Sequence, residues 1–316
     1  MKNLLIIGLG RLGVRHLQGM LNSGIAAHIY CIDIYKRSIE DAKEKASEVS
    51  HGSELIYSPE LPEGKQIDLA IIATNSSERF DLSKKLLESN EVRHLILEKV
   101  VFTNPNEYST FSKLLKTQNT ACYVNHVRRL FPHYQKLKDQ LQTTVPIYGS
   151  VSGSGWGLAS NTLHFIDLFQ FLTGSIAIEI NTKGLKDFFP AKRKGYDEIS
   201  GLLEVKFANN STLFIYCGEA DFNGISIHLS QNNQQFFINE GLSNIMKSSE
   251  VSEIETIRSF MVTETTAQIT KELLNTDSCQ LPKFNNIKDT HELFVSTLFD
   301  MYSNTTNTAN EKLKIT

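Results

Sequence analysis

The sequence opens with LLIIGLGRLG over residues 4–13, a short apolar run that leads directly into the pattern Gly8-x-Gly10-x-x-Gly13. The next apolar run, HIYCID, closes on an acid, Asp33. Strand, glycine-rich turn, helix, second strand and terminal acid, at a spacing of about twenty residues, predict a dinucleotide-binding βαβ unit. In such a unit Gly8 permits the tight turn, Gly10 lets the main chain approach a pyrophosphate, and Gly13 lets the helix pack close to the strand.

The same unit indicates which dinucleotide it prefers. The helix N-terminus after the turn, with Arg11 and Leu12, offers main-chain N–H groups and a partial positive charge to the phosphates. The Asp33 carboxylate would accept hydrogen bonds from the adenosine ribose hydroxyls and repel a 2′-phosphate. Lys36 and Arg37 follow closely in the sequence, and their positive charges would reduce the preference for a ribose without a 2′-phosphate. We therefore expect NAD as the cofactor rather than NADP.

Apolar runs and helical segments alternate regularly up to residue 125. Near-continuous apolar strands separated by helices predict a doubly wound parallel sheet that is covered on both faces. The expected strands are 2–8, 27–33, 54–57, 68–74, 94–99 and 121–125, and the expected helices are 12–21, 38–49, 77–89 and 107–116. We assign residues 1–125 to an N-terminal Rossmann domain.

The pattern changes beyond about residue 145, where strand-like runs follow one another with turn residues between them. The expected strands are 145–152, 177–182, 201–208, 211–217, 225–230 and 235–239, and the expected helices are 162–172, 251–274 and 287–302. This predicts a C-terminal α+β domain over residues 126–302, built on an open, mostly antiparallel sheet. Residues 303–316 are rich in Asn and Thr and are expected to form a flexible tail.

Composition excludes several classes of protein. The net charge is -3 with 21% charged residues, which predicts neither a nucleic-acid nor a membrane partner. No run reaches the roughly twenty apolar residues of a membrane helix, and we expect a cytoplasmic protein. The cysteines are scattered without paired or histidine-adjacent spacing, so neither a metal site nor a disulfide framework is expected.

Polar residues follow the expected parallel strands at Thr74-Asn75, Glu98-Lys99 and Asn125. These carboxyl ends meet at the edge of the sheet where a dinucleotide binds. Partial burial and the charge of an oxidised nicotinamide would favour the neutral amine of Lys99, which would let it exchange a proton with a substrate oxygen. The alternative is a strand-end lysine that is solvated or paired with Glu98.

A second cluster lies in the segment SNTLHFID, which contains Ser160, Asn161, His164 and Asp167. Apolar residues surround the expected helix almost completely, so we expect it to be buried, with Ser160 or Asn161 as its N-cap. His164 and Asp167 share one face. Asp167 would orient His164, which would then act as an acid or base. The alternative is a core His–Asp pair without a chemical role.

Together these motifs resemble the glucose–fructose oxidoreductase, inositol dehydrogenase and rhizopine catabolism (Gfo/Idh/MocA) family. The resemblance adds to the residues above an Asn-x-x-Arg-Arg-x-x-Pro stretch that begins at Asn125, and it covers nearly the whole chain. It implies that Lys99 matches the catalytic lysine of the family's Glu-Lys-Pro motif and that His164 matches its active-site histidine. It also implies that Asn125 lies in the turn beneath the nicotinamide.

Members of this family oxidise or reduce sugars, inositols, amino sugars and sugar nucleotides at one carbinol carbon. The resemblance therefore implies an NAD-dependent oxidoreductase that acts on a carbohydrate-type alcohol or ketone, with substrate contacts from Lys99, Ser160, Asn161 and His164. Phe214 and Tyr216 would lie on the open face of the second sheet, where a homodimer or homotetramer would form. The alternative for these two aromatic residues is an ordinary place in a strand.

Two positions depart from the family pattern. Val100 stands where the motif has proline, and Ser160 stands four residues before His164, where members commonly carry an acid. A hydroxyl can hydrogen-bond a substrate but cannot take up charge as a carboxylate does. These departures favour an alternative function, a non-catalytic dinucleotide-binding sensor or accessory protein. The fold is also compatible with a reductase for a non-sugar carbonyl.

Overall fold

The computed structural model describes residues 1–248, 253–306 and 313–316. The chain divides into two compact units. Unit 1 comprises Met1–Phe102, Asn106–Val127 and Phe260–Asn286, and unit 2 comprises Thr103–Pro105, Arg128–Ser259 and Ile287–Thr316. No helix among the described residues is both long enough and apolar enough to cross a membrane.

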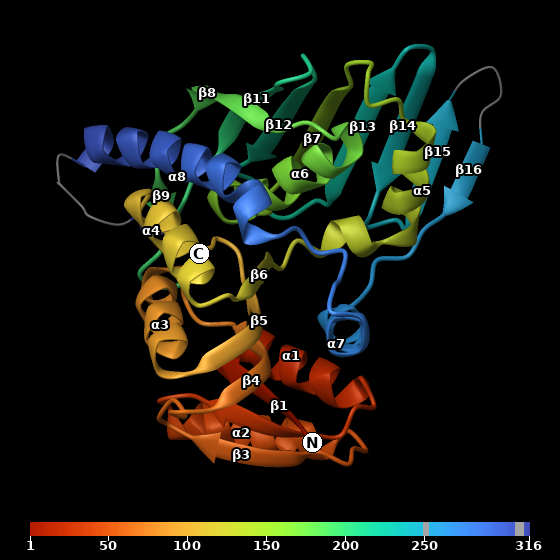
Figure 1. Ribbon diagram of the computed structural model, residues 1–316. Coiled ribbons are helices and arrows are strands. Elements are labelled where there is room, and N and C mark those ends of the chain that lie inside the picture. The colour runs from red at the N-terminus through yellow and green to blue at the C-terminus, as the bar shows by residue number, and fades with distance from the viewer. Residues whose placement is uncertain (249–252, 307–312) are drawn as a thin grey trace. The chain divides into compact units, whose positions relative to one another are not determined.

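Unit 1 is built on a six-stranded sheet in the order β3-β2-β1-β4-β5-β6, and every neighbouring pair is parallel (Figure 1). The strands are β1 (Lys2–Ile7), β2 (Ala27–Ile32), β3 (Glu54–Ser58), β4 (Gln66–Ile72), β5 (Glu91–Leu97) and β6 (Ala121–Val124). The strand order reverses between β1 and β4, which is where an open α/β sheet places its ligand. The predicted doubly wound domain is confirmed.

Helices follow the strands of unit 1 as the alternation predicts. They are α1 (Arg11–Asn22), α2 (Lys36–Ser47), α3 (Ser76–Ser89) and α4 (Asn106–Thr117). Right-handed crossovers place the first two helices on one face of the sheet and the next two on the other. In agreement, α1 contacts α2, and α3 contacts α4.

The domain boundary predicted at residue 125 misses a part of unit 1 that is distant in sequence. Helix α7 (Val262–Thr276) packs against α1 so closely that a Cβ on Gly19 would lie 2.5 Å from the Cβ of Thr266. Thr266 and its neighbours therefore complete unit 1 from the C-terminal part of the chain.

The helix predicted over residues 251–274 begins too early. Residues 251 and 252 lie outside the described part of the chain, and β16 (Glu253–Thr256) pairs antiparallel with β15 (Asn244–Ser248). The Glu264 carboxylate accepts a hydrogen bond from the Met261 main-chain N–H at 2.8 Å. This hydrogen bond caps the helix at Met261, so α7 begins there rather than earlier.

Unit 2 contains an eight-stranded sheet in the order β16-β15-β14-β13-β7-β12-β11-β8 (Figure 1). The remaining strands of this sheet are β7 (Tyr148–Ser154), β8 (Ala177–Leu185), β11 (Gly201–Phe207), β12 (Thr212–Gly218), β13 (Ile225–Gln231) and β14 (Gln234–Asn239). All neighbouring pairs are antiparallel except β7 and β12. The predicted mostly antiparallel sheet is confirmed.

Helix α6 (Leu158–Thr173) packs on one face of this sheet, where a Cβ on Gly149 would lie 2.5 Å from the Phe169 ring. Helix α8 (Phe284–Thr306) confirms the last predicted helix. The prediction omitted a 3-10 turn at Val127–Leu130 and helix α5 (Pro132–Gln140). Proline at the first helical position is a start signal that the sequence does carry.

The predicted flexible tail differs from the structure at both of its ends. Residues 303–306 continue α8, and residues 307–312 lie outside the described part of the chain. Leu313 and Ile315 are buried, and the Leu313 N–H donates to the Thr103 carbonyl at 3.1 Å. Two apolar side chains with period two can add an extended segment to a fold even within a polar stretch.

Candidate dinucleotide and substrate sites

The glycine-rich turn after β1 has the geometry that its spacing predicts. A Cβ on Gly13 would lie 1.7 Å from the Gly8 carbonyl oxygen, so α1 approaches the strand more closely than any other residue would allow. Gly10 is the N-cap of α1 and gives it no side-chain hydrogen bond. A Cβ on Gly10 would meet nothing within 4 Å. The main chain at the helix N-terminus is therefore open to a ligand.

A cavity of about 960 Å³ adjoins this turn. Its lining contains four cationic side chains and one acidic one. The lining residues are Leu9, Gly10, Arg11, Leu12, Val14, Arg15, Tyr35, Arg37, Ser38, Asp41 and Lys45. The predicted residues Arg11 and Leu12 are thus part of an open, cationic surface that suits phosphate groups.

Asp33 lies beside the same turn. Its Oδ2 accepts a hydrogen bond from the Leu9 N–H at 2.7 Å, and its Oδ1 accepts one from the Tyr35 N–H at 2.8 Å. Each carboxylate oxygen has a second lone pair available to a ribose hydroxyl. The open main chain, the cationic cavity and this carboxylate together fit a dinucleotide.

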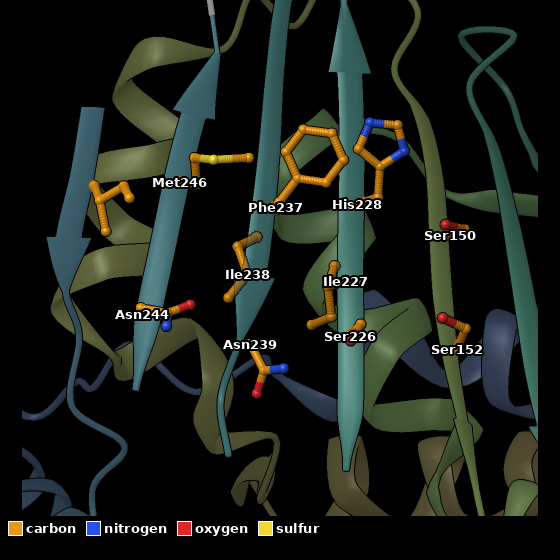
Figure 2. A pocket seen from close by; sticks show the side chains of 11 residues that line it. Ser150, Ser152, Ser226, Ile227, His228, Phe237, Ile238, Asn239, Asn244 and Met246 are labelled. Atoms are coloured by element: carbon orange, nitrogen blue, oxygen red, sulfur yellow. The ribbon is translucent and has the colours of Figure 1, made fainter. Parts of the chain in front are cut away.

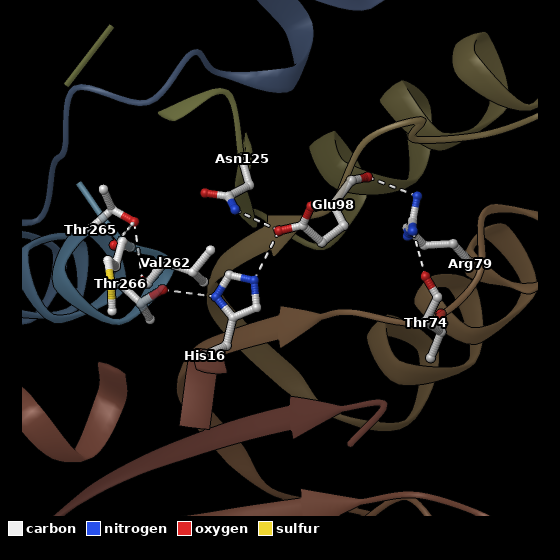
Figure 3. Close-up of polar contacts among 9 residues, drawn as sticks. His16, Thr74, Arg79, Glu98, Asn125, Val262, Thr265 and Thr266 are labelled. Carbon is white, nitrogen blue, oxygen red and sulfur yellow. Dashed lines mark hydrogen bonds and ion pairs between the residues drawn. The ribbon is translucent and has the colours of Figure 1, made fainter. Parts of the chain in front are cut away.

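At the end of β5, a polar network surrounds the buried carboxylate of Glu98 (Figure 3). Glu98 Oε1 accepts hydrogen bonds from His16 Nε2 at 2.9 Å and from Asn125 Nδ2 at 2.5 Å. The other ring nitrogen of His16 lies 2.8 Å from Thr266 Oγ1 on α7. Glu98 and Asn125, both predicted to contact the cofactor, therefore hold each other.

Glu98 remains ionised in this network. Burial by itself would raise the pKa of Glu98, but the hydrogen bond and charge of His16, the hydrogen bond from Asn125 and the charge of Arg79 outweigh it. The result is a pKa below the usual value for glutamate. A fixed negative charge therefore lies next to Lys99 in the chain, and its partners come from α1, from α3 and from the residue that follows β6.

Arg79, which the sequence analysis did not single out, organises the main chain around Lys99. Its guanidinium is 2% exposed and donates to the carbonyl oxygens of Glu98 at 2.8 Å and Val101 at 3.1 Å, and also to that of Val100. It donates as well to the carbonyl of Thr74, at the end of β4 (Figure 3). One side chain thus joins two of the predicted strand ends.

Lys99 itself is half-buried between two buried neighbours, Glu98 and Val100. The Lys99–Val100 peptide bond is cis. Asn75 is the N-cap of α3, so it follows β4 at the same edge of the sheet as Lys99. The structure thus places Thr74, Asn75 and Lys99 at the carboxyl edge of the sheet, as their positions after the strands predict.

In unit 2, the N-terminal half of α6 carries the predicted substrate residues. Ser160, Asn161 and His164 are half-buried, whereas the rest of Leu158–Gln170 is buried. Their spacing puts them on one face of the helix. The predicted cap is corrected, because the N-cap is Gly157, with φ of 77°, and Ser160 and Asn161 lie within the helix.

The N-terminus of α6 instead receives a carboxylate from another element, β10 (Asp197–Glu198), which pairs with β9 (Phe189–Pro190). Glu198 accepts hydrogen bonds from the Ala159 N–H at 2.9 Å and from the Ser160 hydroxyl. Burial raises the pKa of Glu198, and the hydrogen bonds from Ser160 and the main chain offset part of that rise.

Asp167 has a partner that the sequence analysis did not predict. Both of its carboxylate oxygens accept hydrogen bonds from Arg129, at 3.0 Å and 2.5 Å. Arg129 reaches α6 from the turn after β6. Burial raises the pKa of Asp167 to about 6, although the charge and hydrogen bond of Arg129 act in the opposite direction.

The face of the second sheet opposite α6 is partly uncovered. Phe214 and Tyr216 are 41% and 47% exposed, as the alternation in β12 predicts. A cavity of about 340 Å³ lies on β7, β13, β14 and β15, where His228 stacks on Phe237 with ring centroids 4.5 Å apart (Figure 2). Both polar side chains, such as Ser150 and Asn239, and apolar side chains, such as Ile238 and Met246, line the rest of the cavity.

The predicted site residues therefore fall into two groups. The structure brings Asp33 to the glycine-rich turn and joins Glu98, Asn125 and the end of β4 through side-chain contacts in unit 1. Ser160, Asn161, His164 and Asp167 all belong to unit 2. Sequence reasoning missed His16, Arg79, Arg129, Thr266 and Glu198, because each meets its partner through the tertiary fold.

Comparison with known proteins agrees with these features. Residues 2–126 match the GFO_IDH_MocA profile, described as "Oxidoreductase family, NAD-binding Rossmann fold". A relative, scyllo-inositol 2-dehydrogenase (NAD(+)) of Bacillus subtilis, is 25% identical over 196 residues, which are 57% of this chain and 56% of that protein. The match thus spans little more than half the length of that curated relative.

Two solved structures share the fold along almost the whole chain. One is an oxidoreductase from Agrobacterium radiobacter in complex with NAD+, L-tartaric acid and magnesium, with 14% identity, a TM-score of 0.72 and coverage of 96% of this chain and 97% of that chain. The other is a super-repressor mutant of Gal80p from Saccharomyces cerevisiae, with 14% identity, a TM-score of 0.72 and coverage of 96% of both chains. Residues 2–126 thus match the family model of the GFO_IDH_MocA oxidoreductases, and almost the whole chain shares the two-domain fold of these solved structures.

Proposed function

We propose that this protein is an NAD-dependent oxidoreductase that transfers hydride between nicotinamide and a carbohydrate-type alcohol or ketone. The observation that carries the proposal is the network around Lys99. Arg79 binds the carbonyls on both sides of Lys99, and His16 and Asn125 hold the preceding Glu98. A strand end that is fixed by two buried charged side chains suits a residue whose position matters for chemistry.

NAD, when bound, supplies the hydride acceptor. The main chain at Gly10 and the N-terminus of α1 would bind its pyrophosphate, and Asp33 would bind its adenosine ribose. Asn75 and Asn125 would contact the nicotinamide end. The Lys99 amine would then take the proton from the substrate hydroxyl as the carbon is oxidised, and would return it in the reverse direction.

Unit 2 would bind the substrate. We assign His164 as the partner acid or base, with Ser160 and Asn161 as hydrogen-bonding groups for the substrate on the same face of α6. Asp167, which we assign to the orientation of His164, also forms an ion pair with Arg129 that fixes the buried side of the helix. Inositols are the first substrate class to test, because the Bacillus subtilis relative is a scyllo-inositol dehydrogenase.

The direct test is absorbance of reduced nicotinamide while the protein is mixed with NAD⁺ and a panel of inositols, sugars, amino sugars and sugar nucleotides. We expect turnover with one of these compound classes. NADH binding without turnover on any alcohol, or of any ketone in the reverse direction, would instead support a dinucleotide-binding sensor, the alternative that Val100 and Ser160 favour.

A separate proposal concerns the oligomeric state and is based on the partly uncovered face of the second sheet. We infer that a second copy of the chain covers Phe214, Tyr216 and the adjacent cavity, which gives a homodimer or a homotetramer. Clustered exposed aromatic residues are typical of surfaces that associate. Light scattering should then give a mass of two or four chains, and the replacement of Phe214 and Tyr216 by serine should lower it. A monomer at micromolar concentration would contradict this assembly.

A further inference from the structure

A series of buried polar contacts runs from α7 to the residue that precedes Lys99 (Figure 3). Thr266 Oγ1 on α7 lies 2.8 Å from His16 Nδ1, and His16 Nε2 lies 2.9 Å from Glu98 Oε1. Thr266, His16 and Glu98 are 2%, 1% and 4% exposed. Because bulk water does not reach these side chains, it cannot replace a contact that is lost from the series.

The Thr266 hydroxyl suits His16 in either protonation state of the imidazole. The ionised Glu98 carboxylate only accepts hydrogen bonds, so His16 Nε2 donates to it. The other ring nitrogen, Nδ1, accepts a hydrogen bond when the imidazole is neutral and donates one when it is charged. A hydroxyl group can take part in both ways. An apolar residue in place of Thr266 would leave the buried Nδ1 without this partner, which is unfavourable.

Close packing of α7 on α1 brings Thr266 to His16. A Cβ on Gly19 of α1 would lie 2.5 Å from the Thr266 Cβ, so a side chain at position 19 would push the two helices apart. Threonine hydroxyls in helices often bond to a carbonyl of the preceding turn, as the Thr265 hydroxyl does with Val262 at 3.1 Å. The Thr266 hydroxyl contacts a side chain of another helix, so the contact does not follow from helix geometry alone.

We propose that Thr266 is a positioning residue for Lys99, which it supports through His16 and Glu98. The proposal rests on the proposed function, because it takes the Lys99 amine as the group that exchanges the proton. Arg79 holds the main-chain carbonyl of Glu98 and His16 holds its side chain, so the residue before Lys99 is fixed at two points. Without the Thr266 hydroxyl, the imidazole would lose the contact that sets its orientation. Small displacements of a reacting group lower the rate steeply.

The test compares Thr266→Val with the wild type in the oxidation of scyllo-inositol by NAD⁺, or of the panel compound that the wild type oxidises fastest. Valine keeps the branched shape of threonine and removes only the hydroxyl. We expect kcat to fall about tenfold, because the proton-transfer group is displaced. The KM of the substrate and the dissociation constant of NADH should stay within about twofold of the wild type.

Thr266→Ser separates positioning from packing. Serine keeps the hydroxyl and loses a buried methyl group, whereas valine keeps the methyl group and loses the hydroxyl. If Thr266 acts through His16, Thr266→Ser should keep kcat within about twofold of the wild type, although the lost methyl group lowers its melting temperature. A role in packing alone predicts the opposite order, with the serine variant the less active of the two.

Thr270→Val is the matched control. Thr270 lies one turn further along α7 and is fully buried, and within the described ranges its hydroxyl has no hydrogen-bond partner. The substitution is chemically the same as Thr266→Val, but it removes no contact. Its kcat should remain within about twofold of the wild type. A loss equal to that of Thr266→Val would show that α7 does not tolerate valine and would overturn the proposal.

A double-mutant cycle tests whether Thr266 acts through His16. Glutamine in place of His16 can present an amide N–H to Glu98, as Nε2 does, but has no atom at the position of Nδ1. In the His16→Gln background, Thr266→Val should therefore change kcat by less than about twofold. The same tenfold loss in both backgrounds would show that Thr266 acts independently of His16, and would overturn the proposal.

The two proposals fail in different ways. Turnover by the wild type that is unchanged in Thr266→Val would leave the reaction and remove the role of Thr266. An absence of turnover by the wild type on every compound of the panel would overturn the proposed reaction, and the role of Thr266 in it would fall as well.

Discussion

The Arg79 guanidinium donates to the main-chain carbonyl of Glu98 at 2.8 Å and so connects α3 to the end of β5. This contact makes a buried cation part of the support for Lys99, the neighbour of Glu98. Arg79 is 2% exposed, and three of the carbonyls it binds belong to the buried residues Glu98, Val100 and Val101. The support for the proposed catalytic lysine is therefore also a stability element of unit 1.

We expect Arg79→Lys to lower the free energy of unfolding by about 3 kcal/mol, because an ammonium cannot reach all the carbonyls that the planar guanidinium binds. Urea denaturation measures the change. Arg93→Lys is the control, since Arg93 pairs with Asp277 at the surface with half of its side chain exposed, and its loss should stay below about 1 kcal/mol. Equal losses in the two variants would refute a special role for Arg79.

Gly10 and Gly13 should respond differently to alanine. Gly13→Ala would place a methyl group 1.7 Å from the Gly8 carbonyl and should destabilise the folded protein. Gly10→Ala meets nothing within 4 Å and should leave the melting temperature unchanged, while NADH affinity falls at least about tenfold because the methyl group blocks the approach of the pyrophosphate. Calorimetry and thermal melting measure both effects. Unchanged NADH affinity in Gly10→Ala would place the dinucleotide elsewhere.

Cofactor preference should depend on Asp33. We expect the wild type to bind NADH at least about tenfold more tightly than NADPH, a difference of about 1.4 kcal/mol. Asp33→Ala should narrow that ratio, because the repulsion of a 2′-phosphate disappears and Arg37 in the cavity remains. Glu40→Ala, which removes a carboxylate from α2 outside the cavity lining, should leave the ratio as it is. Equal or tighter NADPH binding by the wild type would contradict the NAD assignment.

The Asp167–Arg129 pair should give unit 2 a pH-dependent stability. Burial raises the pKa of Asp167 from 3.8 to about 6, so the folded state binds the proton more tightly than the unfolded state does. The resulting stabilisation is fully present below about pH 4 and is lost as the pH rises through about 6.

The variant Asp167→Asn lacks this titration. The free energy of unfolding of the wild type, relative to that of the variant, should therefore fall by about 2 kcal/mol between pH 4 and pH 7. The exposed Asp221→Asn serves as the reference for effects that are not specific to Asp167. A constant difference over this pH range would show that Arg129 keeps Asp167 ionised throughout.

Local sequence patterns predicted the parts of this fold that are local in origin. Periodicity and spacing within the alternating strands and helices predicted the glycine-rich turn from Gly8 to Gly13 and the acid at Asp33. They also predicted the position of Lys99 after β5. His16, Arg79 and Glu198 have no such signal, because their partners lie 82, 19 and 38 residues away in the chain. Buried polar side chains find partners through tertiary packing, which one-dimensional spacing does not encode.

The same reason explains the two segment errors. Residues 253–256 pair with β15, and the hydrogen bond between Met261 and Glu264 starts α7 further along the chain. The C-terminal residues 313–316 form hydrogen bonds with Thr103 and Asp197. The polar composition of the tail gives no indication of these two distant partners.

The central claim is that Lys99 performs chemistry rather than binding. Its most direct test compares Lys99→Ala with the wild type for two quantities, the rate of NADH formation on the substrate found in the panel and the dissociation constant of NADH. We predict that turnover falls at least about a thousandfold, while NADH binds within about twofold of the wild type. Full turnover in Lys99→Ala, or a loss of NADH binding that accounts for the lost turnover, would contradict the claim.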